Sequence, residues 1–108
     1  MHPADSPVEY VIVWRYRVVP KHRDAFERAY GPRGPWVILF ATAVGYRGTD
    51  LVRGEAAGEY LTVDRWESRQ QYDAFRSERR VYYERLDAEF EALTESESLV
   101  FEGTVIAP

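Results

Sequence analysis

The sequence predicts an α+β fold of the ferredoxin-like kind, in which a split β-α-β plan forms a four-stranded antiparallel sheet with its helices on one face. Three observations predict this fold. The chain has 108 residues, which is the size of one domain. Its strand-like and helix-like segments follow the order β-α-(α)-β-β-α-α-β. Its first strand is apolar on both faces, as expected of a sheet that is covered on both sides.

The first half of the chain reads as one strand and two helices. Residues 8–18 (VEYVIVWRYRV) are β-branched and aromatic, which is typical of a strand. Pro20 then suits the first turn of an amphipathic helix that ends at Gly31. After the turn-rich GPRGP, residues 35–43 (PWVILFATA) carry large apolar residues at helical spacing and predict a short helix.

The second half reads as a hairpin, two helices and a last strand. Residues 45–54 and 59–66 predict two strands joined through the loop EAAGE. Ser68, followed three residues later by Gln71, is a capping-box pattern that predicts a helix over 68–79. A further helix follows, with one apolar stripe made of Tyr82, Leu86, Phe90 and Leu93. Tyr82 and Tyr83 open this helix, and one of them is expected to face inward with Leu86.

Residues 98–106 (SLVFEGTVI) predict the last strand, and its alternation puts Leu99, Phe101 and Val105 on one side. We expect one domain over residues 8–106. Residues 1–7 are expected to form a short disordered or extended lead.

The first strand also predicts a partner. Tyr10, Ile12 and Trp14 alternate with Val11 and Val13, so both faces of the strand are apolar. The helices of this plan cover only one face. We therefore expect a homodimer through the sheet face, in which two copies of the sheet pack together.

Composition excludes several classes of protein. The 14 Lys and Arg residues are interspersed with 18 Asp and Glu residues, for a net charge of −4, so no basic face is predicted for nucleic acid. The absence of cysteine excludes disulfides, thiolate nucleophiles and cysteine-based metal sites. No stretch approaches the roughly 20 apolar residues that span a bilayer, and no signal peptide is visible. We expect a cytoplasmic protein without a membrane partner.

The stretch YLTVDRWES places an unusual polar and aromatic row on one face of a strand. Tyr60, Thr62, Asp64 and Trp66 share parity and point to the same layer. A buried, isolated Asp64 would have a raised pKa and would suit general acid or base chemistry.

Two structural alternatives apply to Asp64. It accepts hydrogen bonds from the cap region at Ser68, or it pairs with Arg47 or Arg53 on the neighbouring strand. The aromatic content of 15% leaves two alternatives as well: the rings line a ligand pocket, or they fill a small core.

The order of RYRVVPKHRDAFERAYG, a short apolar helix around Trp36, GYRGTDLVR and YLTVDRWES with a following tyrosine resembles the antibiotic biosynthesis monooxygenase family of dimeric α+β barrels. The resemblance extends from about Val8 to Val105. It implies a monooxygenase without metal or cofactor that oxidises an electron-rich aromatic or polyketide-type substrate, such as an anthrone, naphthol or quinol, with molecular oxygen. The alternative is a non-oxidative protein that cyclises a polyketide or binds an aromatic small molecule in the same pocket.

The resemblance also implies site residues. Trp66 at the strand-to-helix junction and Tyr72 six residues later match family positions, whereas Thr62 stands where the studied oxygenases carry asparagine. A hydroxyl has one donor hydrogen where an amide has two. Together with Asp64, which the parity of the strand suggests, the candidate catalytic residues are Trp66, Thr62, Asp64 and Tyr72. The implied substrate-binding residues are Trp14, Tyr16, Trp36, Phe40, Phe75 and Tyr82.

Other family features have no clear match. The family's arginine on the later helix corresponds to Arg76, Arg79 or Arg80. Trp66, Tyr72 and Phe75 also suit plain core positions. The haem-degrading branch uses a histidine on the helix after the tryptophan and an asparagine on the first strand. Phe75 and Trp14 stand near those positions, and the histidines are His2 and His22, so haem breakdown is not expected.

Overall fold

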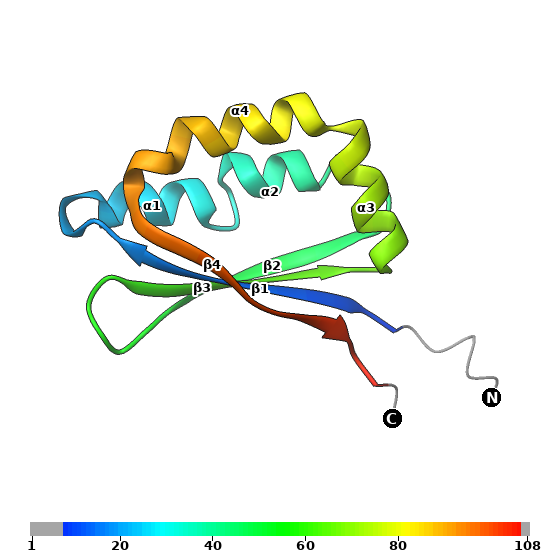
Figure 1. Cartoon of the computed structure of the whole chain (residues 1–108), viewed down its shortest axis with the longest axis horizontal. Coiled ribbons are helices and arrows are strands. Elements are labelled where there is room, and N and C mark those ends of the chain that lie inside the picture. The colour runs from blue at the N-terminus through cyan, green and yellow to red at the C-terminus, as the bar shows by residue number, and fades with distance from the viewer. Residues whose placement is uncertain (1–7, 107–108) are drawn as a thin grey trace.

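Four antiparallel strands form one sheet in the order β2-β3-β1-β4, and the helices all lie on one face of it (Figure 1). The computed structural model describes residues 8–106. This arrangement confirms the predicted ferredoxin-like α+β class. The strands are β1 (Tyr10–Val18), β2 (Tyr46–Arg53), β3 (Glu59–Trp66) and β4 (Thr94–Thr104). Residues 1–7, expected to form a lead, lie outside the described residues.

The helical segments begin and end at residues with clear local roles. They are η2 (Pro20–His22), α1 (Arg23–Tyr30), α2 (Pro35–Phe40), α3 (Arg69–Glu78), α4 (Arg80–Phe90) and η3 (Glu91–Leu93). Pro20 and Pro35 open η2 and α2, where a missing backbone N–H costs nothing. The Ser68 hydroxyl accepts a hydrogen bond from the Gln71 backbone N–H at 3.1 Å, which confirms the predicted cap of α3. No helix within residues 8–106 is long and apolar enough to cross a bilayer.

Strand β3 has the alternation that its sequence predicts. Tyr60, Thr62, Asp64 and Trp66 are all buried on the face toward the helices, which we call the inner face. The residues between them are half-buried on the opposite, outer face. Because β3 is paired on both sides, by β1 and β2, this row lies at the centre of the molecule.

A bulge in β2 changes which residues face the helices. Tyr46 pairs with Trp66, and Gly48 pairs with Arg65, so one extra residue lies between them. Gly48 has a φ of 124°, a backbone conformation that side chains with a Cβ rarely adopt. Tyr46 and Thr49 therefore both point to the inner face, although they are three residues apart.

Strand β4 differs from its expected form. It begins at Thr94, before residue 98, and its register against β1 shifts so that Val13 pairs with Phe101 and Trp14 with Leu99. The prediction that Leu99 and Phe101 share one side was wrong, because the bulge at Val100 reverses the alternation. Leu99 accompanies Trp14 on the inner face and Phe101 accompanies Val13 on the outer face.

Helix α4 presents Tyr83, not Tyr82, to the core. Tyr82 is 55% exposed, whereas Tyr83, Leu86 and Phe90 pack against the buried residues. Both tyrosines fit helical spacing with Leu86. The chain leaves the helical conformation at Arg79 (φ −111°, ψ 22°) between α3 and α4, and this break sets the rotation of α4.

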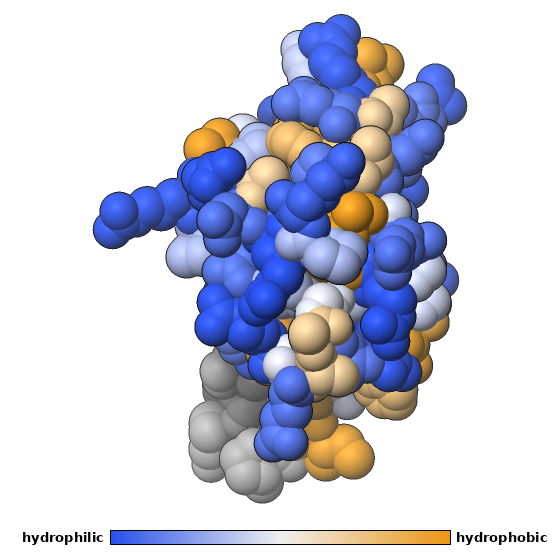
Figure 2. Space-filling view, turned by 90° about the vertical axis from the view of Figure 1, so that its left-hand side faces the viewer, coloured by the Kyte–Doolittle hydropathy of each residue, from blue (hydrophilic) through white to orange (hydrophobic). Residues whose placement is uncertain are grey.

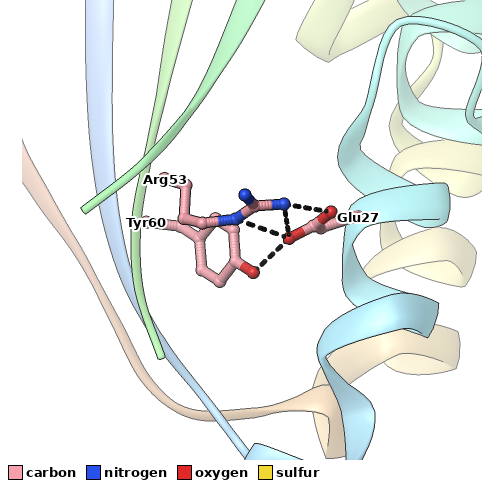
Figure 3. Close-up of polar contacts among 3 residues, drawn as sticks. All are labelled: Glu27, Arg53 and Tyr60. Atoms are coloured by element: carbon pink, nitrogen blue, oxygen red, sulfur yellow. Dashed lines mark hydrogen bonds and ion pairs between the residues drawn. The ribbon is translucent and has the colours of Figure 1, made fainter. Parts of the chain in front are cut away.

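A polar cluster of Glu27, Arg53 and Tyr60 joins α1 to the sheet (Figure 3). The Arg53 guanidinium donates to both Glu27 oxygens at 2.8 and 2.9 Å, and the buried Tyr60 hydroxyl also donates to Glu27. These bonds lower the pKa of Glu27, with the Tyr60 hydrogen bond the larger cause. At this end of the molecule, near η2 and the β2–β3 turn, the surface is mainly hydrophilic with small separate apolar groups (Figure 2).

The outer face of the sheet carries no helix (Figure 1). Its side chains are largely aliphatic near the middle: Val11, Val13, Val52, Leu61, Val63, Val100 and Phe101. Phe101 is 63% exposed, and Val52 and Val100 are exposed as well. Ion pairs flank this group, with Arg15 against Glu59 and Arg65 against Asp50.

Candidate functional site

A cavity opens between the inner face of the sheet and helices α1, α2 and α4. Its volume is about 50 Å³, and the empty space is about 480 Å³ when the mouth that opens to solvent is counted with it. Such a cavity holds a few water molecules as it stands, since one water needs about 10–15 Å³ on this measure. The lining residues are Trp14, Tyr16, Tyr30, Trp36, Val37, Phe40, Thr49, Thr62, Asp64, Tyr83, Asp87 and Glu97.

Asp64 is the buried charge of this cavity. It is 7% exposed, and the Thr49 hydroxyl donates a hydrogen bond to its Oδ1 at 2.7 Å. The Tyr46 hydroxyl lies 2.6 Å from the Thr49 hydroxyl and must donate to it, because Thr49 has already given its single hydrogen to Asp64. Burial raises the pKa of Asp64 to about 6, and the Thr49 hydrogen bond opposes that rise.

Neither structural alternative for Asp64 holds. Arg53 binds Glu27, and Arg47 lies 3.8 Å from Glu67. Ser68 accepts from the backbone of its own helix. The partner that the structure provides is a neutral hydroxyl, which leaves the Asp64 carboxylate without a cation among residues 8–106.

Thr62 and Tyr16 form a second polar group in the lining. Their hydroxyl oxygens are 3.1 Å apart, and either one can donate to the other. Whichever hydroxyl donates, the accepting hydroxyl keeps its own hydrogen. The pair therefore offers one O–H donor to a ligand in the cavity.

Six of the ten expected site residues line the cavity: Trp14, Tyr16, Trp36, Phe40, Thr62 and Asp64. Trp66 and Phe75 do not. They are 0% and 2% exposed, and their ring centroids are 5.1 Å apart within the core. Trp66 also packs against Phe40, which does line the cavity, at 5.8 Å. Trp66 thus supports the wall of the cavity from behind.

The other two expected residues lie away from the lining. Tyr72 packs its ring against Trp66 at 5.3 Å and accepts a hydrogen bond from Arg76 at 2.9 Å. Tyr82 is exposed at the surface of α4, and Tyr83 takes the lining position instead, for the reason given above.

None of the three arginines that the family resemblance suggests, Arg76, Arg79 and Arg80, lines the cavity. The Arg76 guanidinium stacks 3.9 Å from the centroid of the Tyr83 ring but is not a lining residue. Arg79 donates to Thr42 at 3.3 Å. No lysine, arginine or histidine belongs to the lining within the described part of the chain.

Sequence reasoning missed Tyr30, Val37, Thr49, Tyr83, Asp87 and Glu97. Gly48 in a strand was the signal that pointed to Thr49, because an isolated glycine there marks a bulge that reverses the alternation. Asp87 and Glu97 had no local signal, since they meet only when α4 and β4 pack together. Burial and the nearby Asp87 and Glu91 raise the pKa of Glu97.

The donor set does not fit a metal or a porphyrin. Residues 8–106 contain no group of three or more His, Asp or Glu side chains that could hold a metal ion. The one histidine in that range, His22, lies on η2 outside the cavity lining. The cavity lining in the described part of the chain holds no histidine, cysteine or methionine, three of the usual haem ligands.

Comparison with solved structures confirms the fold. The protein PA3566 from Pseudomonas aeruginosa superposes with a TM-score of 0.67 at 14% identity, covering 93% of this chain and 96% of that one. A variant of SnoaB, a cofactor-independent oxygenase from Streptomyces nogalater, gives a TM-score of 0.64 at 17% identity, with 92% of each chain covered. A variant of MhuD with two manganese protoporphyrin IX bound per active site gives 0.68 at 18% identity, covering 92% of this chain and 96% of that one.

Comparison with family models gives a match over residues 9–81, which is more than half of the chain, to antibiotic biosynthesis monooxygenase. No curated protein matches. The match begins just before β1 and ends in the first turn of α4, so it contains β1, β2 and β3, which supply Tyr16, Thr49, Thr62 and Asp64. On this evidence the chain belongs to the antibiotic biosynthesis monooxygenase family.

Proposed function

We propose that this protein is a cofactor-independent monooxygenase that oxidises an electron-rich aromatic substrate, such as an anthrone, naphthol or hydroquinone, with molecular oxygen. The observation that carries the proposal is a carboxylate, Asp64, buried at a ring-lined cavity without a cationic partner among the described residues. Such a group has the raised pKa that a general base needs near neutral pH.

In the proposed reaction Asp64 takes a proton from the substrate and produces a phenolate or enolate. This anion gives one electron to oxygen, and the caged radicals recombine with formation of a C–O bond to a peroxide. The peroxide takes up the proton, and loss of water with the remaining ring hydrogen leaves a carbonyl. One oxygen atom of O₂ thus enters the product and the other leaves as water, without an external reductant.

The Tyr16 and Thr62 hydroxyls would assist this reaction by donating a hydrogen bond to the developing oxyanion. The rings of the cavity would hold a flat substrate and keep water out. Trp66 and Tyr72 would act indirectly, because both lie behind the lining and support it.

We also propose that the protein works as a homodimer. The support is the aliphatic outer face, which no element within residues 8–106 covers, between flanking ion pairs (Figure 1). Exposed apolar patches of this kind mark association surfaces. A two-fold contact would cover both copies of the face with one interaction.

Oxygen consumption tests the proposed activity. In metal-free buffer, a panel of anthrones and hydroquinones should give stoichiometric oxygen uptake with the wild-type protein. Asp64→Asn should lower kcat by about 100-fold or more, the usual effect of losing a general base. Thr62→Val should give a smaller loss, and the exposed Thr104→Val is the matched control.

The same assay without oxygen separates the alternative function. A cyclase or a binding protein would use the same rings without oxygen. Unchanged turnover under anaerobic conditions would contradict the monooxygenase and favour cyclisation. Binding without turnover in either atmosphere would leave a binding protein.

A further inference from the structure

The charges of the cavity have one sign. Asp64 lies buried in it, and the exposed Asp87 of α4 and Glu97 of β4 belong to the same lining. No basic side chain belongs to the lining within the described residues, although Arg76, which stacks on Tyr83, lies close enough to interact with Asp87. Several acidic groups elsewhere in the molecule are paired: Glu27 with Arg53, Glu59 with Arg15, Asp50 with Arg65. Asp64, Asp87 and Glu97 form no ion pair of this kind within the described residues.

The rest of the lining also suits a positive charge. Six aromatic rings face the cavity: Trp14, Tyr16, Tyr30, Trp36, Phe40 and Tyr83. Ring faces attract cations, tryptophan most strongly, and a cage of rings with carboxylates is how proteins recognise organic ammonium groups. Trp36 and Tyr83 approach each other edge to face at 4.9 Å, so their two planes form a corner of the cage.

Two buried polar groups remain available to a ligand. The Asp64 carboxylate receives one hydrogen bond from the described residues, that of Thr49, although a carboxylate can accept about four. The indole N–H of Trp36, a residue only 6% exposed, has no acceptor of good geometry among residues 8–106, although the Tyr30 hydroxyl lies close to it. Buried polar groups in this state are costly without a partner. A ligand with both an acceptor oxygen and a cationic donor would satisfy them.

The proposed chemistry needs such a charge. It creates a phenolate or enolate, and the three carboxylates of the lining, offset in part by Arg76 near Asp87, oppose a new anion in the cavity. A positive charge on the substrate itself would offset them and stabilise the anion.

We propose that the substrate is a phenolic or quinol-type aromatic that carries a protonated amine, bound with its ammonium group between Asp87 and Glu97 and its oxygenated ring among the aromatic side chains. This inference rests on the proposed function for the oxidisable ring. It adds the charge of the substrate, which the family resemblance does not specify.

Three small phenols of matched shape test the charge preference. Tyramine, 4-ethylphenol and 3-(4-hydroxyphenyl)propionate share a phenol ring and a two-carbon arm, which carries an ammonium group in the first, no further group in the second and a carboxylate in the third. Binding is measured by calorimetry and tryptophan fluorescence at pH 7.5. Tyramine should bind at least about 10-fold more tightly than 4-ethylphenol, and the propionate most weakly, with the difference decreasing in high salt.

Substitutions at Asp87 and Glu97 test whether these residues cause the preference for tyramine. Glu97→Gln and Asp87→Asn should each reduce the tyramine preference, and the double variant should abolish it while 4-ethylphenol binding stays the same. Glu84→Gln is the control, since Glu84 is exposed on α4 and does not line the cavity. Equal affinity for the three phenols, an equal loss in Glu84→Gln, or no binding of any of them at millimolar concentration would overturn the inference.

The two proposals fail separately. Binding is measured with simple phenols that need no turnover, and oxygen uptake is measured with hydroquinones. A tyramine preference without oxygen uptake would remove the monooxygenase but keep the ammonium site. Oxygen uptake without a charge preference would keep the monooxygenase and remove the ammonium site.

Discussion

At the scale of single residues, Asp64 is buried and has a neutral hydroxyl, that of Thr49, as its hydrogen-bond partner among the described residues. Its neighbours that titrate are the tyrosines 16, 46 and 83, which stay neutral well above pH 7, and the carboxylates of the cavity mouth. Arg76 stacks on Tyr83, one of these tyrosines, and does not line the cavity. Asp64 therefore takes its properties mainly from lost hydration.

The pH dependence of activity follows from this position. If Asp64 is the general base, kcat/KM should rise as the pH increases through about 6, where the buried carboxyl ionises. Thr49→Val removes the hydrogen bond that favours the ionised form, so the midpoint should move to higher pH. Rates of oxygen uptake from pH 4.5 to 9 would show both effects. A profile that is the same in Thr49→Val and wild type would contradict the assignment.

The ionisation of Asp64 should also affect the stability of the protein, but in the opposite direction. The ionised form that supports activity lowers the stability of the fold. The folded-state pKa of Asp64, about 6, is above the ordinary 3.8, so the folded state holds its proton more tightly and loses stability as the pH rises from about 4 to 6. Asp64→Asn avoids that loss and keeps the acceptor for Thr49. Its free energy of unfolding at pH 7 should exceed that of the wild type by on the order of 2 kcal/mol.

Urea denaturation at two pH values checks this prediction. The gain should be present at pH 7 and absent at pH 4, where the wild-type carboxyl is neutral as well. A variant that is less stable than the wild type at pH 7 would mean that Asp64 has a favourable partner that a neutral amide cannot replace.

At the scale of elements, the bulge in β2 decides what Asp64 contacts. Gly48→Ala places a Cβ where no atom lies within 4 Å, so the cost is that of the backbone conformation alone. We expect a loss of about 1–3 kcal/mol in the free energy of unfolding. Gly103→Ala, on β4 and without a positive φ, is the control, since its Cβ would lie 3.1 Å from the ring of Phe101, an exposed side chain that can move aside.

Function should respond to Gly48→Ala as well. If the bulge relaxes, Thr49 no longer faces Asp64, and the pH profile should move in the same direction as in Thr49→Val. A fully stable Gly48→Ala variant with the wild-type profile would show that the bulge does not depend on glycine.

The contact between α1 and the sheet makes a second prediction at this scale. Tyr60 is 1% exposed and donates to Glu27, so Tyr60→Phe should reduce the free energy of unfolding by about 1–2 kcal/mol at pH 7. The pKa of Glu27 is lowered in the folded state, so this stabilisation is complete above its ordinary pKa of 4.5 and decreases as the pH falls below it.

Denaturant unfolding of the wild type and Tyr60→Phe at pH 7 and pH 3 measures this destabilisation. The loss of unfolding free energy should be smaller at pH 3. Tyr82→Phe, at an exposed position of α4, should have little effect at either pH.

At the scale of the whole molecule, the outer face of the sheet predicts the assembly. Val13 lies at its centre, paired with Val63 and Phe101. Val13→Glu would place a charge in the proposed interface and should convert a homodimer into a monomer at micromolar concentration. Val81→Glu, at a 60% exposed position of α4, introduces the same charge on the helical side.

Analytical ultracentrifugation of the three proteins gives the answer, with circular dichroism as a test of folding. Val81→Glu should sediment as the wild type does. A wild-type protein that is monomeric at micromolar concentration would contradict the homodimer directly.

Prediction from the sequence was good where the signal is local. The alternation of β3, the cap at Ser68 and the proline starts of η2 and α2 depend on neighbours within a few residues, and the structure confirms them. Prediction failed at Tyr82 and at Leu99 with Phe101, because a break between helices and a bulge reset the rotation or alternation that periodicity assumes.

The sequence by itself determined the order of the elements, the fold class and the buried row that contains Thr62 and Asp64, since hydrophobic period and turn chemistry act along the chain. Only the tertiary structure decided the surroundings of that row. The choice of Thr49 over Arg47 or Arg53 as the partner of Asp64, the removal of Trp66 from the cavity wall and the arrival of Asp87 and Glu97 at its mouth all depend on how separate elements meet. Such contacts are set by packing between strands and helices far apart in sequence, and Gly48, which marks the bulge before Thr49, is the local signal that the sequence offers for them.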